Sequence, residues 1–189
     1  MSGGDDGGPL RAFAEAERLV YQPAEELGRG GRLHGVHGVC RGVEVDAGPF
    51  VRAGSRYLDR HGTPPPLEVR VRGRAIHPTE DTLCLWPNGV LTRLARLLGA
   101  PSWVSGDARF DAAYLVETTS GALADAIVDA EQRERVVALG AFEFLSLEGG
   151  EVELVLGPAP QDEARLRAGL AIVVAAAHVL PPPPTLPYR

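Results

Sequence analysis

Hydrophobic and polar residues along this chain follow two periods, one typical of strands and one typical of helices. Between residues 67 and 74, Leu67, Val69 and Val71 alternate with charged side chains. This period of two predicts a strand with one buried face and one solvated face.

The segment after this strand combines both periods. Apolar residues over 82–86 predict a second short strand, which Pro87 and the following turn pair would end. Four leucines at helical spacing then predict a helix over 90–98, with Gly99 as its stop.

The N-terminal residues predict a helix followed by two strands. The helix covers 9–27, because Pro9 suits a first turn and apolar residues gather on one side, and it ends at the Gly28 cluster. Strands over 32–39 and 42–46 follow, joined by a turn near residues 40 and 41.

The second half of the chain predicts a strand, two helices, a hairpin and a last helix. Gly149 and Gly150 mark the hairpin turn, and Ser120 is a suitable helix cap. The ranges are 110–117, 120–129, 131–139, the strand pair 142–147 and 151–156, and 161–179 with its apolar stripe Leu166, Leu170, Val173 and Ala177. This order predicts an α+β protein with a mainly antiparallel sheet and packed helices, β-rich in its N-terminal half.

The chain is long enough for one compact unit, since it has 189 residues and a hydrophobic content of 44%. We expect a half over 9–100 and a half over 101–180 to pack together, after a flexible leader at 1–8 and before a Pro-rich tail at 181–189. The leader lacks the pattern of a signal peptide, and the longest apolar run, 170–180, is too short to span a bilayer.

Charge and residue usage exclude several classes of function. The net charge of -6 argues against general nucleic-acid binding. The charge is uneven, because residues 101–189 hold 6 Arg and 13 acids, whereas residues 1–100 hold 13 Arg and 12 acids. The chain has no lysine, which excludes Schiff-base chemistry and the lysine-dependent phosphate sites of nucleotide-binding enzymes.

The two cysteines are too few for a disulfide framework, so we expect a cytoplasmic protein with free thiols. A cysteine nucleophile would need Cys84 or Cys40 beside a histidine and an orienting group, and His77 and Asp81 lie near Cys84 in the sequence. Because Cys84 alternates with leucines in a short apolar strand, we favour an inert cysteine that acts as a small hydrophobic residue.

The stretch GRGGRLHGVHGVCRG, residues 28–42, is the most crowded with reactive groups. His34, His37 and Cys40 are ligand types that zinc accepts, so a metal-dependent or small-molecule enzyme is one hypothesis. A strand would place His34 and Cys40 on one face and His37 on the other, which weakens it. A phosphate cradle is another hypothesis. Its glycines would need a strand before them and a helix after them, whereas the order predicted here is helix, glycines, strand.

Two further motifs, GDARFD and the Pro-rich tail, are better explained by structure or partner contact than by catalysis. In GDARFD, Asp107 and Asp111 are better explained by a turn before a strand, with Phe110 in the core, than by a catalytic carboxylate pair. The tail 181–189 favours a polyproline II extension that a partner's aromatic groove would accept, and a disordered end is the alternative.

An arginine-rich strand is a candidate anion or partner contact. Residues 29–74 hold 9 Arg and 4 acids, and Arg70, Arg72 and Arg74 fall on one strand face. Arginine binds carboxylates and phosphates through paired hydrogen bonds, so an acidic ligand or protein is a suitable partner. The alternative is an ordinary solvated strand face.

The segments TLCLWPNGVLTRLARLLGA and SGDARFDAAYLVET, within residues 67–180, resemble a group of uncharacterised bacterial α+β proteins. Those proteins share an LxRLxRLLG helix followed by a GDxxFDxxFxV strand, and some have transmembrane segments. The resemblance implies the same fold and brings no catalytic residue or cofactor. Because no catalytic constellation in the sequence meets its geometric and compositional requirements, we expect a non-enzymatic binding or assembly module without a cofactor.

Overall fold

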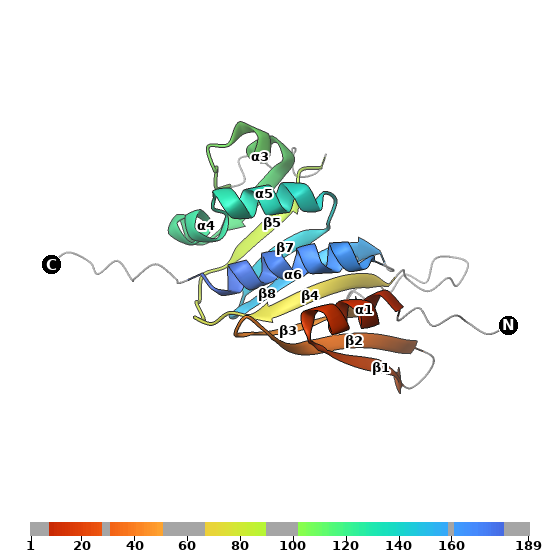
Figure 1. Cartoon of the computed structure of the whole chain (residues 1–189). Helices are drawn as coiled ribbons and strands as arrows, with labels where there is room; N and C mark the ends of the chain where they lie inside the picture. The colour runs from red at the N-terminus through yellow and green to blue at the C-terminus, as the bar shows by residue number, and fades with distance from the viewer. Residues whose placement is uncertain (1–7, 28–30, 51–66, 90–101, 159–160, 180–189) are drawn as a thin grey trace.

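The computed structural model describes residues 8–27, 31–50, 67–89, 102–158 and 161–179. Its strands form one eight-stranded sheet in the order β1-β2-β3-β4-β8-β7-β5-β6, and each neighbouring pair is antiparallel (Figure 1). The α+β prediction, with its antiparallel sheet and β-rich first half, is confirmed.

The two halves of the chain share this sheet, and they pair with each other where β4 meets β8 and where β5 lies between β7 and β6. The first half supplies β1 to β5, and the second half supplies β6, β7 and β8. The bounds in spatial order are β1 (Val20–Leu27), β2 (Gly31–Cys40), β3 (Val43–Phe50), β4 (Glu68–Arg74), β8 (Glu151–Pro158), β7 (Phe144–Glu148), β5 (Leu83–Pro87) and β6 (Tyr114–Thr118).

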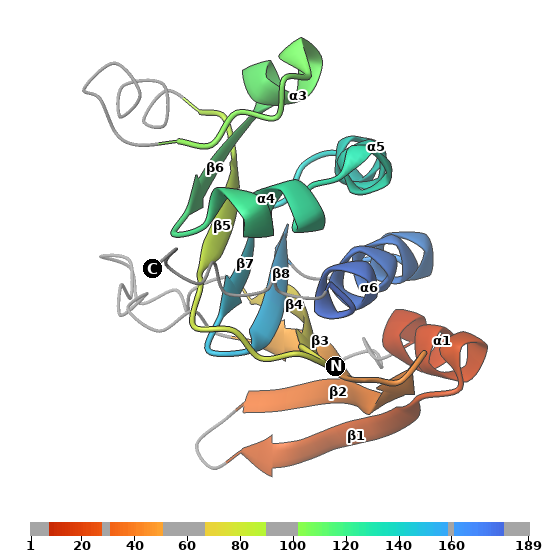
Figure 2. The ribbon, with the colours of Figure 1, turned by 90° about the vertical axis from the view of Figure 1, so that its left-hand side faces the viewer.

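Four helices lie on one face of the sheet, as the two views at right angles show (Figures 1 and 2). They are α1 (Gly8–Glu17), α4 (Gly121–Ile127), α5 (Ala130–Leu139) and α6 (Glu163–Ala177). A fifth, α3 (Ala108–Ala113), lies beside β6 at the end of the sheet. The described part of the chain thus forms two layers, a sheet and the helices that lie on one of its faces.

The core lies between the sheet and α6. Alternation decides which strand residues enter it: Val69, Val71 and Gly73 of β4 are buried, whereas the residues between them are partly exposed. The predicted stripe of the last helix, Leu166, Leu170, Val173 and Ala177, is buried in full. Helix and sheet therefore bury the faces that their periods predict.

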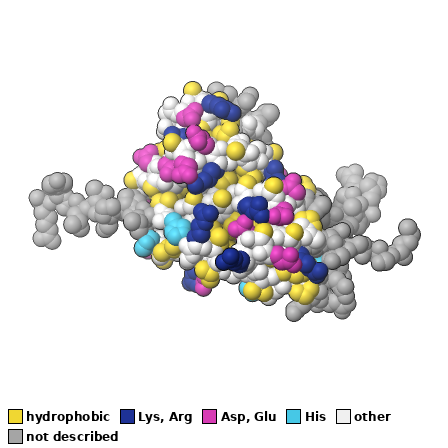
Figure 3. Space-filling model, in the orientation of Figure 1, with side chains coloured by type: hydrophobic (Ala, Val, Ile, Leu, Met, Phe, Trp, Pro, Cys, Tyr) yellow, Lys and Arg dark blue, Asp and Glu magenta, His cyan; other side chains and the backbone are white. Residues whose placement is uncertain are grey.

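Charged side chains on the helix-covered side mix both signs, as Figure 3 shows for that face. Arg167 of α6 pairs with Glu17 of α1 and Glu163 of its own helix, at 2.8 and 2.6 Å. These exposed pairs contribute little stability, about 1 kcal/mol or less each. Positive and negative side chains are therefore mixed around Arg167.

The predicted helix over 9–27 is wrong beyond Glu17. Arg18 has a φ of 57, a left-handed conformation that ends α1, and Val20–Leu27 is the edge strand β1. Pairing with β2 outweighs the local apolar pattern here, and Pro23 disfavours a continuing helix.

The strand predicted over 110–117 begins too early. Asp107 caps a short helix instead, because its carboxylate accepts hydrogen bonds from the backbone amides of Arg109 and Phe110. The strand starts at Tyr114. The other elements of the second half are confirmed, including the Gly149-Gly150 hairpin and the Ser120 cap.

Some predictions fall outside the described residues: the leader up to residue 7, the glycines at 28–30, the helix over 90–98 and the tail 181–189. Within the part of the chain that is described, no helix has both the length and the hydropathy needed to cross a bilayer.

Candidate functional site

The sheet face opposite α1, α4, α5 and α6, here named the open face, has none of the described helices lying over it (Figure 2). Seven side chains form a line across this face, because strand register places each directly opposite the next. This polar row consists of His37, Asp46, Arg72, Glu153, Ser146, Cys84 and Glu117.

The candidate arginines on β4 face carboxylates of the neighbouring strands. Arg72 donates from Nε to both oxygens of Asp46 at 2.9 and 3.1 Å, and from a terminal nitrogen to Glu151 at 3.2 Å. A terminal nitrogen of Arg74 lies 3.7 Å from a carboxylate oxygen of Glu44. Partial burial acts to lower the pKa of Arg72, but its bond to Asp46 and the nearby carboxylates raise it.

Arg70 has a different neighbour, since its guanidinium lies 4.8 Å above the ring of Phe50. The acids around the three arginines offset much of the positive charge that the sequence suggested for this strand. Arg72 links β4 to both of its neighbouring strands, and Arg70 is the β4 arginine that stacks on an aromatic ring.

Glu153 lies at the centre of the polar row. Burial is the main cause that raises its pKa, the charges of Arg70 and Arg72 act to lower it, and Glu151 and Asp46 raise it. A raised carboxyl pKa favours the protonated form, so Glu153 contributes less stability as the pH rises through its folded-state pKa.

An apolar row runs beside the polar row on the same face. It joins Trp86 and Phe144, whose ring centroids are 5.3 Å apart, to Leu115 and Val155. The last two are 2% and 0% exposed. Leu115 and Val155 are thus closed to solvent, Trp86 and Phe144 are partly exposed, and the polar row is the more accessible part of the open face.

Two hollows indent the accessible part. The smaller, of about 280 Å³, lies over Gly35 and Gly48, with His37 and Arg70 at its rim. A Cβ at Gly48 would lie 2.8 Å from the carbonyl oxygen of His34, so only glycine fits this close approach of two strands.

The larger hollow, of about 490 Å³, lies around Cys84 and Ser146 and is bordered by Glu117 and Glu148. The small side chains of Cys84 and Ser146 leave the space that the longer carboxylates enclose. This hollow joins groups from β5, β6 and β7.

The Cys84 thiol does not have the environment of a nucleophile. Burial is the main cause that raises its pKa to about 12, and the charges of Glu117 and Glu148 add to the effect. Asp81 accepts a hydrogen bond from Thr119, and among the described hydrogen bonds none joins Cys84 to His77. Such a thiol stays protonated at neutral pH.

We expect Cys84 in the variant Cys40→Ser to react with iodoacetamide at pH 8 at least tenfold more slowly in the native protein than in urea. Fewer thiolates form at the raised pKa, and greater nucleophilicity offsets only part of that loss. Mass spectrometry of the alkylated protein measures both rates. Equal rates in native and unfolded protein would contradict the high pKa.

The structure does not bring His34, His37 and Cys40 together. All three lie on β2, where His34 and Cys40 are on the helix-covered face and His37 is on the open face. Six residues of strand place His34 and Cys40 about 20 Å apart. His34 instead stacks on Tyr21, whose hydroxyl lies 2.5 Å from its Nδ1.

This arrangement does not match a three-ligand zinc site, and the described residues hold no group of three or more His, Cys, Asp or Glu placed for a metal. The metal-dependent alternative thus gains no support from β2.

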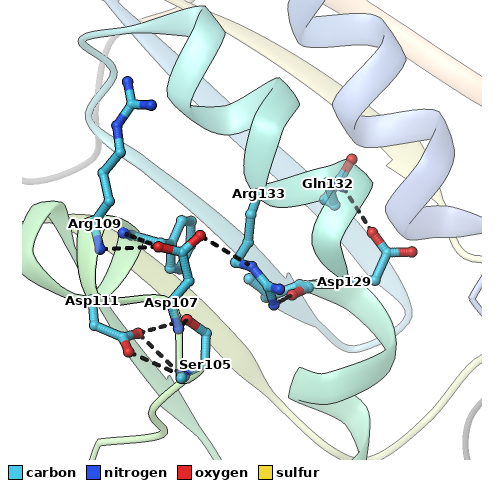
Figure 4. Close-up of polar contacts among 10 residues, drawn as sticks. Ser105, Asp107, Arg109, Asp111, Asp129, Gln132 and Arg133 are labelled. Carbon is cyan, nitrogen blue, oxygen red and sulfur yellow. Dashed lines mark hydrogen bonds and ion pairs between the residues drawn. The ribbon is translucent and has the colours of Figure 1, made fainter.

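The GDARFD acids have structural roles, which Figure 4 shows. Asp111 accepts hydrogen bonds from the amide and hydroxyl of Ser105, at 3.0 and 2.8 Å, and from the amide of Gly106 at 3.1 Å. Asp107 caps α3 and lies 4.0 Å from Nε of Arg133. Phe110 is buried as predicted. The two carboxylates organise the turn that leads into α3.

Comparison with known proteins adds a structural neighbour. No protein-family model matches the chain, and no curated protein matches it in sequence. The crystal structure of the mycobacterial trehalose monomycolate transport factor A, TtfA, aligns with 95% of this chain and 98% of its own, with a TM-score of 0.58. The two proteins share a fold. Their identity of 17% limits the likeness to TtfA to that fold.

The sequence alone did not single out Glu117, Glu148, Glu153 or Ser146 as site residues. The signal was present in each strand, since all four stand at the polar positions of an alternating segment. Strand order, which places Glu117, Glu148 and Ser146 around Cys84 and Glu153 beyond Ser146, is a long-range property that the same alternation does not reveal.

Proposed function

We propose that this protein is a non-enzymatic binding module that receives a partner on the open face of its sheet. The observation that carries the proposal is the polar row with its two hollows, on a face that the described helices leave uncovered. A sheet covered on one side and accessible on the other has a large, rigid surface for contact.

Two further observations support a binding role. The candidate reactive groups have structural partners or lie apart, as with Asp107, Asp111, and the β2 histidines. TtfA, which shares the fold, is described as a transport factor. We further propose a cytoplasmic location, because Cys40 and Cys84 are free thiols, which reducing compartments maintain.

The test is affinity capture from a lysate of the cells that encode the protein, with two matched variants. Ser146→Arg places a long charged side chain in the larger hollow, and Ala138→Arg places the same side chain on the exposed surface of α5. We expect Ser146→Arg to reduce capture of the partner at least tenfold and Ala138→Arg to leave it unchanged.

Circular dichroism melting shows whether each variant is folded, and Glu117→Arg, at an exposed position, repeats the test if Ser146→Arg is not. A partner lost equally in the Ala138 variant, or kept in both open-face variants, would rule out the open face as the binding surface.

A further inference from the structure

The half of the open face formed by β8, β7, β5 and β6 has negative charge only. These four strands contain four glutamates and no basic residue. Register places all four on the open face, because two belong to the polar row and the other two lie two residues from a member of it along the same strand. The first two are Glu117 and Glu153, and the others are Glu148 and Glu151. Four of the 13 acidic residues of the segment 101–189 therefore lie together on this half of the open face.

Two of these carboxylates are directly opposite each other. Glu148 and Glu151 pair across the β7–β8 hairpin, and like charges in that position repel. Arg72 reaches Glu151 from β4 but is bound to Asp46 at the same time. A cation placed over β7 would relieve the repulsion at Glu148.

The larger hollow is where such a cation would fit. Glu117 and Glu148 border it on the strands either side of β5, and both act on the Cys84 thiol between them, raising its pKa. Glu117 and Glu148 are two interstrand spacings apart and are offset by two residues along the strands, which separates their backbone positions by about 12 Å. One guanidinium or ammonium group is too small to contact both, so the geometry favours a chain with several basic groups.

We propose that the larger hollow binds a basic, extended segment of a partner protein, with alternate arginine or lysine side chains pairing with Glu117 and Glu148. Side chains two apart in an extended segment are on the same side, about 7 Å from one another, and flexible basic side chains cover the remaining distance. Charge-assisted bonds to carboxylates supply the specificity. The inference rests on the proposed function, since it names the chemistry of the partner for the same face.

The probe is a fluorescein-labelled nine-residue peptide that alternates arginine and serine, with glutamate–serine and glycine–serine peptides of equal length for comparison. Fluorescence anisotropy measures binding to the wild type and to two double variants. Glu117→Gln with Glu148→Gln removes the charges at the hollow. Glu15→Gln with Glu134→Gln removes two exposed charges from α1 and α5 and changes the net charge equally.

We expect the arginine peptide to bind the wild type best, to lose at least fivefold in affinity in the open-face variant, and to stay within twofold in the helix-side variant. Binding should also weaken as salt rises. Equal losses in both variants would indicate attraction to overall charge and overturn the inference, as would failure of the arginine peptide to bind.

The remaining outcomes separate this inference from the proposed function. In one such outcome a glycine–serine or glutamate–serine peptide binds, Ser146→Arg blocks its binding, and Glu117→Gln with Glu148→Gln does not change its affinity. This result would overturn the inference of a basic partner, and the open face would still be the binding surface. Spermine that displaces the arginine peptide and binds more tightly would point to a polyamine instead. Analytical ultracentrifugation tests for a dimer of this chain. A dimer that dissociates when Glu117 and Glu148 are changed to glutamine would show that the partner is a second copy of the chain instead.

Discussion

Gly73→Val is expected to lower the free energy of unfolding by about 3 kcal/mol, the upper part of the range for overpacked cores. Gly73 lies in β4 beneath α6, and a Cβ there would stand 2.7 Å from Cγ1 of Val173 and 3.2 Å from Cγ1 of Val43. Both valines are 0% exposed, so neither has room to move away. Urea unfolding followed by circular dichroism measures the change.

The matched control is Gly89→Val, because nothing lies within 4 Å of a Cβ at Gly89. Its stability should stay within about 0.5 kcal/mol of the wild type, the usual range for surface changes. A second check uses Gly73→Ala, which should regain stability when combined with Val173→Ala, since the shortened partner makes room. Equal stability of the Gly73 and Gly89 variants would contradict the close helix–sheet contact.

Most elements of the fold were predicted where local sequence decides the structure. The Gly149-Gly150 hairpin and the stripe of α6 follow from a turn signal and a period that short segments contain. Residues 18–27 were mistaken for helix because their strand is formed by pairing with β2, which no local pattern reports.

The candidate site was predicted less well, for a related reason. Alternation in β4 identified Arg70, Arg72 and Arg74 on the solvated face. It did not identify the acids that face them, since Glu151 lies 79 residues further along the chain from Arg72. The arginine-rich strand was predicted as a candidate anion or partner contact, and pairing with β3 and β8 gives Arg72 and Arg74 carboxylate partners that its own alternation did not reveal.

For the candidate metal ligands on β2, in contrast, a local rule was enough to predict how their side chains are placed. A strand separates successive side chains onto opposite faces, and this alone predicted that His37 would be apart from His34 and Cys40. The structure has the same separation. What the rule did not reveal is the partner of His34, because Tyr21 comes from a segment predicted as helix.

Arg165→Met is expected to lower the free energy of unfolding by about 2 kcal/mol, since a charged donor to several carbonyls is lost. Arg165 lies in the first turn of α6 and donates to the backbone oxygens of Leu139 and Leu156 at 3.3 and 3.2 Å, and to that of Ala141. Leu139 ends α5, where helix carbonyls have no partner within the helix. One side chain thus ties together α6, α5 and β8, and methionine keeps its length without the donors.

Arg167→Met is the matched control, two residues further along the same helix. Arg167 contacts only carboxylates among the described hydrogen bonds, Glu17 and Glu163, in pairs that are solvent-exposed. Its loss should cost under about 1 kcal/mol. Arg165→Lys should fall between the two, because an ammonium group keeps the charge but lacks the planar fork that reaches three oxygens. Urea unfolding compares all three, and an Arg165→Met midpoint equal to that of Arg167→Met would show that the carbonyl contacts of Arg165 do not hold the layers together.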